Sequence, residues 1–469
     1  IRNLGWFGQL QTGYDNILFL TLSARYDGSS TLVKPGFSLE ERVRDAYFFY
    51  PAGSLAFNFT ELSAFKNMSW LDYGKLRFSI GKTGKTAKTP YVTSSRYVPV
   101  STTGGGFALS VFAGNPDLKP EFTTNLEVGT ELKFFKNRLG LDVAYYTMKS
   151  INQITAPRLS YATGAILKWL NGGTVENKGI EITLTGTPIK TTNAQWDITL
   201  NFDKNKNKIT EMPADLPIFY ISDYDILPFG GVKAFYKVGG SISALGTEAS
   251  GATAFLRNNQ GKLLISPTSG LPIRDTVPTL LGDRNPDFKM GFIHNVRYKN
   301  WSLSANFDIR VGGDVFNGND LAMNNIGLSM RTLDRETPRV IEGVLRDGLE
   351  NTANPTPNTI IVTPYFQNGY YNNIYNIEDY FQRDVNWVRL RDVTLAYNFT
   401  SLLQKRQRLI KSGSVFVTGT DVFMITNYTG VDPNVSALNA SAGGYGGQGF
   451  DYGALALPVG INFGVRLTF

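Results

Sequence analysis

The sequence predicts an all-β protein, a transmembrane antiparallel β-barrel, and three observations support this prediction. Apolar and polar residues alternate along many segments of about ten residues, as they do on strands with one apolar face. The 469 residues include 31 Phe, 23 Tyr and 48 Gly but only 18% charged residues, a composition typical of extended chain with many turns. Connections between the alternating segments are short and long in turn. The chain contains no run of about 18 apolar residues, the length that a transmembrane helix needs.

Fourteen segments carry the strand pattern, and we find no helix. The predicted strands cover residues 4–13, 16–26, 47–59, 73–83, 90–101, 122–134, 138–149, 174–187, 194–208, 287–298, 301–312, 386–399, 413–425 and 457–469. Short turns are expected after residues 13, 134, 187 and 298, and long loops over residues 209–286, 313–385 and 426–456. Short periplasmic turns on one side and long extracellular loops on the other are typical of outer-membrane barrels.

The last segment has the clearest alternation. Its even positions are small or polar, and its odd positions are all apolar: Val459, Ile461, Phe463, Val465, Leu467 and Phe469. About eleven residues is also the length that a tilted strand needs to cross a bilayer. These six residues, ending on an aromatic side chain, resemble the C-terminal signal by which outer-membrane barrels are recognised for insertion. The opposite face, with Asn462 and the Thr394 of a neighbouring segment, is expected to line the lumen.

Composition excludes several classes of function. Without cysteine the chain has no disulfide, thiol nucleophile or sulfur-ligated metal, and a single histidine argues against histidine metal sites and catalytic triads. The net charge of +7 is spread along the sequence without a basic block, so we expect no nucleic-acid partner. The start, Ile1-Arg2-Asn3-Leu4, resembles neither an initiator nor a signal peptide, and we expect the chain to begin in mid-protein.

Several segments have the form of motifs from one family. They include Arg25-Tyr26-Asp27-Gly28-Ser29-Ser30, Tyr50-Pro51-Ala52-Gly53-Ser54, Leu76-Arg77-Phe78-Ser79-Ile80-Gly81-Lys82-Thr83-Gly84, Asn115-Pro116-Asp117-Leu118-Lys119-Pro120-Glu121, Asn177-Lys178-Gly179-Ile180-Glu181, Gly312-Gly313-Asp314-Val315-Phe316-Asn317 and Asn427-Tyr428-Thr429-Gly430-Val431-Asp432-Pro433. In this order and spacing they resemble the SusC/RagA family of TonB-dependent outer-membrane transporters of Bacteroidota, over essentially all 469 residues.

The resemblance implies that residues 1–469 are the C-terminal part of a barrel of about 22 strands, with the plug domain, TonB box and first strands outside the chain. It implies TonB-dependent uptake of oligosaccharides or oligopeptides through the outer membrane, with its lipid and lipopolysaccharide. The partners implied are a SusD-like surface lipoprotein and TonB, which acts through the missing N-terminal region, in a dimer of transporter–lipoprotein pairs. A stand-alone, fourteen-stranded passive diffusion porin remains the alternative.

Aromatic residues of the long loops are the candidate substrate contacts, because sugar rings and extended peptides both pack on aromatic faces. The candidates are Tyr220, Tyr224, Phe229, Tyr370, Tyr371, Tyr375, Tyr445 and Tyr452. The alternative is that these rings pack the loops against each other or against a partner protein.

Other polar residues carry weaker signals. His294 lies on an apolar face and is expected to be a barrel-rim or interface residue rather than a ligand or proton relay. Asp314, Asn317, Asn319 and Asp320 loosely resemble an oxygen-rich calcium loop, but turn formation explains the same residues, so we predict no metal and no cofactor. Acidic residues in the loops lack a rigid partner strand, and we predict no enzyme activity.

Overall fold

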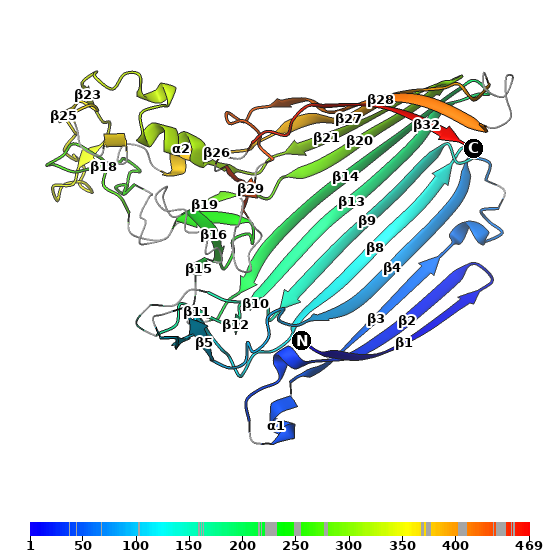
Figure 1. Ribbon diagram of the computed structural model, residues 1–469, viewed down its shortest axis with the longest axis horizontal. Helices are drawn as coiled ribbons and strands as arrows, with labels where there is room; N and C mark the ends of the chain where they lie inside the picture. The colour runs from blue at the N-terminus through cyan, green and yellow to red at the C-terminus, as the bar shows by residue number, and fades with distance from the viewer. Residues whose placement is uncertain are drawn as a thin grey trace.

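One curved antiparallel sheet of thirteen strands forms the body of the computed structural model (Figure 1). The strands follow chain order, and each pairs with the next: β1 (Asn3–Tyr14), β2 (Leu18–Ser29), β3 (Tyr47–Phe57), β4 (Leu71–Lys85), β8 (Glu121–Phe134), β9 (Leu139–Ile151), β13 (Thr174–Lys190), β14 (Ala194–Glu211), β20 (Phe288–Tyr298), β21 (Trp301–Val311), β27 (Trp387–Asn398), β28 (Ser412–Thr426) and β32 (Gly460–Thr468). The structure describes residues 1–36, 38–43, 45–66, 68–101, 104–157, 160, 162, 164–213, 216, 218–220, 232–247, 255–275, 280–366, 370–371, 377–401, 410–434, 436–437, 447–451, 453 and 455–469.

Thirteen of the fourteen predicted strands are confirmed, with ends within three residues of those predicted. The prediction for residues 90–101 is wrong, because the chain leaves the sheet after Lys85. Tyr91 takes a left-handed conformation (φ 62°), and Pro90 and Pro99 have no N–H to give to a strand ladder. Only β5 (Tyr97–Val100) is extended, and it pairs outside the barrel sheet with β6 (Gly106–Leu109).

The structure contains short helices, so the prediction that the chain has no helix is wrong. Within the described residues they include α1 (Leu39–Val43), α2 (Gly318–Asn325) and 3-10 turns at Ser30–Leu32, Phe59–Glu61, Met330–Thr332 and Ile377–Tyr380. A capping box starts α1, since the Glu41 N–H donates to Ser38 Oγ (3.1 Å) and the Ser38 N–H donates to Glu41 Oε2 (3.1 Å). Such local signals are invisible to a search for long apolar periodicity. None of the helices in the described ranges has the length and apolar character to cross a membrane.

The two ends of the sheet differ as predicted. At one end, here the turn end, β1 and β2 are joined by residues 15–17, with Asp15 and Asn16 at positive φ as a tight hairpin requires. At the other, the loop end, the connections are long and cover residues 30–46, 86–120, 152–173, 212–287, 312–386 and 427–459. They carry the remaining short strands (Figure 1). Most residues outside the barrel sheet therefore lie at the loop end.

The strand register gives the sheet one continuous apolar face. Leu303 of β21 lies beside Leu395, which lies beside Val417, and Phe463 of β32 completes the row. The six predicted residues of the last strand share this face, with exposures from 41% (Leu467) to 81% (Phe463). His294 belongs to it too, and its Nδ1 accepts a hydrogen bond from Trp196 Nε1 (3.3 Å). Exposed apolar rows of this kind are the surface that a barrel turns toward lipid.

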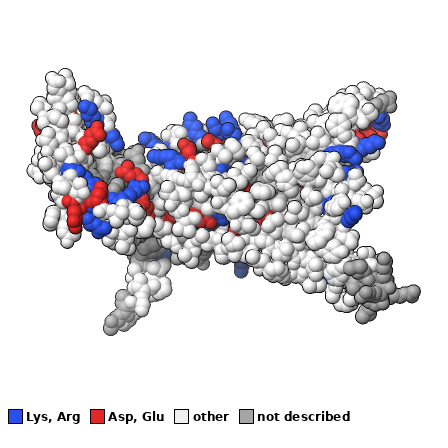
Figure 2. Space-filling view, turned by 90° about the horizontal axis from the view of Figure 1, so that it is seen from above, with Lys and Arg blue, Asp and Glu red and all other residues white. Residues whose placement is uncertain are grey.

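The opposite face is polar. Thr394, Thr418 and Asn462 form a row beside the apolar one, and the Thr394 and Thr418 hydroxyls are 2.8 Å apart. On the same face Arg77 reaches across to Asp142 with two hydrogen bonds of 2.7 and 2.5 Å. Figure 2 shows charged side chains over the left half of the molecule and at its right end, with a largely uncharged zone between them. Both features fit a sheet that spans a bilayer around an aqueous lumen.

The two edge strands run in the same direction. Thirteen strands in antiparallel sequence place β1 and β32 parallel to each other, and each pairs with one described strand only. An antiparallel closure between them therefore needs an odd number of further strands.

We expect Phe463→Arg to destabilise the folded barrel by about 2–4 kcal/mol, the cost of a lipid-facing cation near the bilayer centre. Asn462→Arg, one residue away on the polar face, is the matched control and is expected to retain folding. Urea unfolding of the full-length protein in lipid vesicles measures both. Equal losses in the two variants would contradict the assignment of the faces.

Candidate functional site

Three long connections of the loop end fold into one unit. Residues 212–287 contribute β15 (Ile218–Tyr220), β16 (Val232–Lys237), β17 (Ala244–Thr247) and β19 (Leu280–Asp283), which form a four-stranded sheet. A second sheet joins β22 (Val315–Asn317), β26 (Phe381–Gln382) and β31 (Phe450–Asp451). Leu245, Phe316, Phe381 and Phe450 pack in one buried cluster between these sheets. The three connections are therefore held by a shared core.

A polar network, here the loop hub, ties the same connections together and consists of Asp314, Asn319, Arg383, Tyr428 and Asp451. The fully buried Asp451 carboxylate accepts hydrogen bonds from the Tyr428 hydroxyl and from Asn319 Nδ2, both at 2.7 Å. Asp314 accepts from Arg383 Nη1 (2.9 Å) and from the Asp283 N–H (2.9 Å). Burial, followed by the hydrogen bond to Asp451, raises the pKa of Tyr428, which therefore stays a hydrogen-bond donor.

All four residues that resemble a calcium loop have protein partners, and Asp320 accepts from Asn324 Nδ2 (3.3 Å) and Ser329 Oγ (3.2 Å) and pairs with Arg331 (3.1 Å). Asp314 and Asn319 belong to the hub, and Asn317 Oδ1 caps α2 by accepting from the Asp320 N–H (3.0 Å). No group of three or more carboxylates or histidines suited to a metal occurs within the ranges that the structure describes. These residues hold loops together.

Charged pairs tie the last connection to the barrel wall and link neighbouring strands of that wall. Arg389 of β27, 2% exposed, donates to Asp432 (2.5 Å) in the last connection and to Asp421 (3.3 Å) in β28. Asp308 of β21 accepts from Arg391 (2.6 Å) and from Trp387 Nε1 (3.3 Å). Because the guanidinium of Arg389 is buried, loss of either carboxylate would leave it under-compensated.

A second body, here the outlying loop body, consists of residues 255–275 and 328–366 with Tyr370 and Tyr371. Two small sheets form it: β18 (Leu264–Ile265) with β24 (Val344–Leu345), and β23 (Arg339–Val340) with β25 (Ile361–Val362). Its core is formed by Ile265, Leu271, Ile341, Val362 and Tyr370. In Figure 1 it projects beyond α2, away from the barrel sheet.

An exposed apolar patch lies where this body joins α2. It consists of Ile326, Leu328, Met330 and Leu333, which are 66%, 72%, 79% and 68% exposed. Exposed apolar side chains grouped outside the lipid-facing wall make this segment a candidate contact for another protein.

The eight aromatic candidates are distributed unevenly. Tyr370 is 3% exposed and packs edge-on against Tyr371 (5.1 Å between centroids) in the outlying loop body. Burial raises the pKa of Tyr371. Tyr220 ends β15, where it pairs in register with Phe235. The other five lie outside the described residues: Tyr224, Phe229, Tyr375, Tyr445 and Tyr452. Substrate contact by the eight stays a prediction.

A cavity of about 440 Å³ at the loop end was not predicted from the sequence. It lies between connections 86–120 and 152–173, and its walls include Lys88, Arg96 and Trp169. Part of its wall comes from residues 90–101, which the sequence predicted as a barrel strand, so no cavity was expected there. Pro90, with Thr and Ser residues on both sides of it, was the sequence signal that could have indicated a loop here.

The fold and its loop end define a class, the outer-membrane β-barrel with a folded extracellular rim. A family model described as TonB dependent receptor-like, beta-barrel, matches residues 1–320, and the chain belongs to that family. The family confirms the outer-membrane location predicted from the alternating strands.

Individual relatives narrow the family assignment further. TonB-dependent receptor P3 of Formosa agariphila is 27% identical over 99% of this chain and 45% of its own length. TonB-dependent receptor SusC of Bacteroides thetaiotaomicron is 24% identical over 92% of this chain and 41% of its own length. The resemblance to the SusC/RagA family is thus confirmed. The chain spans less than half the length of these relatives.

A solved structure supports the fold. The RagAB peptide transporter superposes on 96% of this chain and 46% of that chain, with a TM-score of 0.68 at 19% identity.

We expect Asp451→Ala to loosen the loop hub by about 1–3 kcal/mol, because the Tyr428 hydroxyl and Asn319 amide lose a buried acceptor. Hydrogen exchange over residues 312–320 and 427–434 should speed up while exchange in the barrel strands stays unchanged. Asp334→Ala, which removes an exposed pair with Arg339 (2.9 Å), is the control and should have little effect. Unchanged exchange in Asp451→Ala would refute the role of the hub.

Proposed function

We propose that the chain is the barrel segment of a SusC-type importer that takes up oligosaccharides or oligopeptides through the outer membrane with energy from TonB. The observation that carries the proposal is the loop end, where three connections share a buried core and a buried polar network. A passive pore needs only an open lumen. A folded rim of this size suits a protein that captures a large solute before transport.

The edges of the sheet support a larger barrel. A barrel of about 22 strands would close by adding about nine to the thirteen present, and nine is an odd number, as antiparallel closure requires. The greater length of the relatives leaves room for these strands and for the plug. The stand-alone porin fits less well, because the thirteen strands of this sheet cannot close on each other in antiparallel fashion without a further strand. We assign no catalytic role to the chain.

In this proposal, a SusD-like lipoprotein covers the rim and the substrate is enclosed between them. Substrate shifts the complex toward its closed state only if it binds that state more tightly. TonB then acts through the plug and opens the lumen. The exposed patch of Ile326, Leu328, Met330 and Leu333 supports a lipoprotein contact at the outlying loop body. Two transporter–lipoprotein pairs assemble as a dimer.

Uptake of labelled oligosaccharides and oligopeptides by cells that express the full-length protein tests the transport function. We expect uptake to stop when TonB is deleted or the proton gradient is collapsed, because the plug then stays in place. Uptake that continues without TonB, together with ion conductance in a planar bilayer, would favour the passive porin instead.

We expect the double variant Leu328→Asp, Met330→Asp to reduce copurification of the SusD-like lipoprotein by about tenfold, because two carboxylates would be desolvated at the contact. Leu349→Asp, at a 51% exposed position of the outlying loop body outside the patch, is the matched control. Quantitative mass spectrometry of the purified complex gives the ratio of lipoprotein to transporter. Equal ratios in all three proteins would remove this patch from the interface.

A further inference from the structure

The cavity between connections 86–120 and 152–173, here the rim pocket, is formed by segments that meet only in the folded protein. The end of β4 supplies Lys85, and the segment after it supplies Thr86 to Tyr91, Ser94 and Arg96. Phe112, Ile154 and Trp169 come from β7 (Phe112–Ala113), β10 (Ile154–Thr155) and the residue between β11 (Leu167–Lys168) and β12 (Leu170–Asn171). None of the aromatic candidates named from the sequence lines it.

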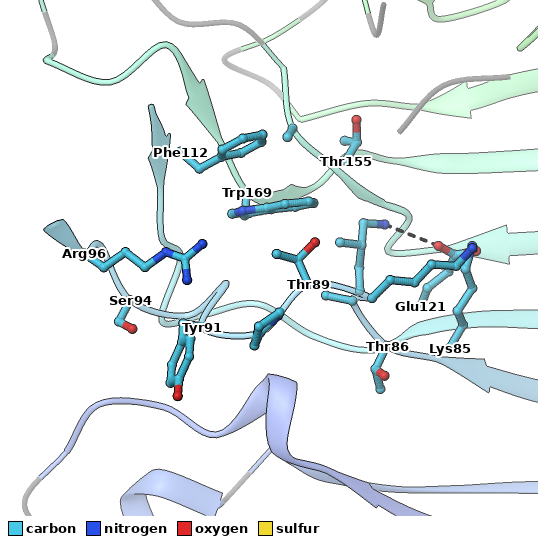
Figure 3. Close-up of a pocket in the computed structure, with 15 residues that line it drawn as sticks. Lys85, Thr86, Thr89, Tyr91, Ser94, Arg96, Phe112, Glu121, Thr155 and Trp169 are labelled. Atoms are coloured by element: carbon cyan, nitrogen blue, oxygen red, sulfur yellow. Dashed lines mark hydrogen bonds and ion pairs between the residues drawn. The ribbon is translucent and has the colours of Figure 1, made fainter. Parts of the chain in front are cut away.

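An aromatic ring forms one wall of the rim pocket. Trp169 is stacked on Phe112, with 5.4 Å between ring centroids and 18° between planes. Phe112 thereby covers one face of the indole, and Figure 3 shows Thr89 on the side of its other face. The hydroxyls of Thr86, Thr89 and Thr155 lie on the lining as well. A flat apolar face surrounded by hydroxyl groups matches a sugar ring, which has an apolar face and polar edges.

The charges of the rim pocket are unbalanced. Its lining contains Lys85, Lys88 and Arg96 but only one carboxylate, Glu121. Glu121 lies 3.7 Å from Lys85 and so compensates that ammonium. Within the described part of the chain, neither Lys88 nor Arg96 has a carboxylate at ion-pair distance. The Arg96 guanidinium extends into the pocket in Figure 3 and lies 5.9 Å from the Tyr91 ring centroid. Two cations are thus available to an anionic ligand.

Tyr91 is held in an unfavourable conformation at the pocket. Its φ of 62° is rare for an aromatic residue, and its side chain is 66% exposed, so burial of the ring does not explain the conformation. The next residues fix it, because the Asn115 N–H donates to the Val92 carbonyl (2.8 Å) and Thr93 Oγ1 donates to the Val33 carbonyl (2.6 Å). Strained residues held by their neighbours cluster at ligand sites.

We propose that the rim pocket binds an anionic sugar unit, with its ring against the face of Trp169 opposite Phe112 and its carboxylate or sulfate beside Lys88 and Arg96. This inference rests on the proposed import function and narrows its substrate class to acidic oligosaccharides. A peptide carboxylate would pair with the two cations, but it would not supply a sugar ring to pack on Trp169 or hydroxyl groups to hydrogen-bond with the surrounding threonines.

Isothermal titration calorimetry of the transporter, purified from outer membranes in detergent, tests the inference with four probes of four units each. They are tetragalacturonate, a sulfated galactose tetrasaccharide, neutral galactotetraose and tetra-alanine. We expect one or both acidic saccharides to bind at least about tenfold more tightly than the neutral one, and the difference to shrink as salt is added. The comparison of the two acidic probes separates carboxylate from sulfate recognition.

Substitutions in the pocket lining test which residues bind the acidic saccharide. Lys88→Gln and Arg96→Gln should each weaken binding of the acidic probe by about tenfold without changing that of the neutral one. Trp169→Ala should weaken both, and Tyr91→Asn, which tolerates the positive φ, should weaken binding without loss of folding. Lys119→Gln, an exposed lysine of the same connection outside the pocket, is the matched control.

Equal affinity for acidic and neutral saccharides, or acidic binding that survives both charge substitutions, would overturn the inference. Binding of tetra-alanine that depends on Arg96 would overturn it in favour of a peptide carboxylate. If no acidic saccharide binds, the inference fails, while TonB-dependent uptake in cells still decides the import function separately. Heat modifiability on electrophoresis verifies that each variant is folded.

Discussion

Pairing of backbone N–H and C=O groups within the sheet is the constraint on which the rest of the structure depends. A bilayer supplies no hydrogen-bond partners, so strands can cross it only in an unbroken ladder. The ladder of this protein runs through all thirteen strands with few register shifts. Irregular backbone is displaced to the ends, and most of it lies at one of them.

The constraint also explains how charge is distributed. Cations and carboxylates cannot face lipid cheaply, so the wall keeps its ion pairs on the polar face, as Arg77 and Asp142 do. Beyond the wall, water and folded loops satisfy polar groups again. At the loop end of the wall the buried Arg389 ties the last connection to β28, and beyond the wall Asp451 joins the connections that carry Asn319 and Tyr428. The loop end combines a rigid part with an exposed apolar patch and an open, positively charged pocket.

Most of the barrel wall could be predicted from sequence because its rule is local. Alternation with period two needs no knowledge of distant residues, and Val459 to Phe469 displays it without interruption. Residues 90–101 alternate too, but one left-handed residue at Tyr91 breaks the strand, and composition does not reveal that angle. The loop hub was beyond such reasoning, since Asn319 and Asp451 are 132 positions apart. Tyr370 illustrates the same limit: its residue type suggested a ligand contact, whereas its burial depends on Ile265 and Val362.

The segregation of turns and loops makes the two sides of the membrane separately addressable. Residues 347–350 form an exposed turn of the outlying loop body, with Leu349 51% exposed, so an epitope inserted there would be read by antibodies outside intact cells. Lys299, at positive φ in the hairpin between β20 and β21, lies at the other end of the sheet. A reporter placed in that hairpin would face the periplasm. The molecule thus offers two labelling positions from which its orientation in a membrane can be read.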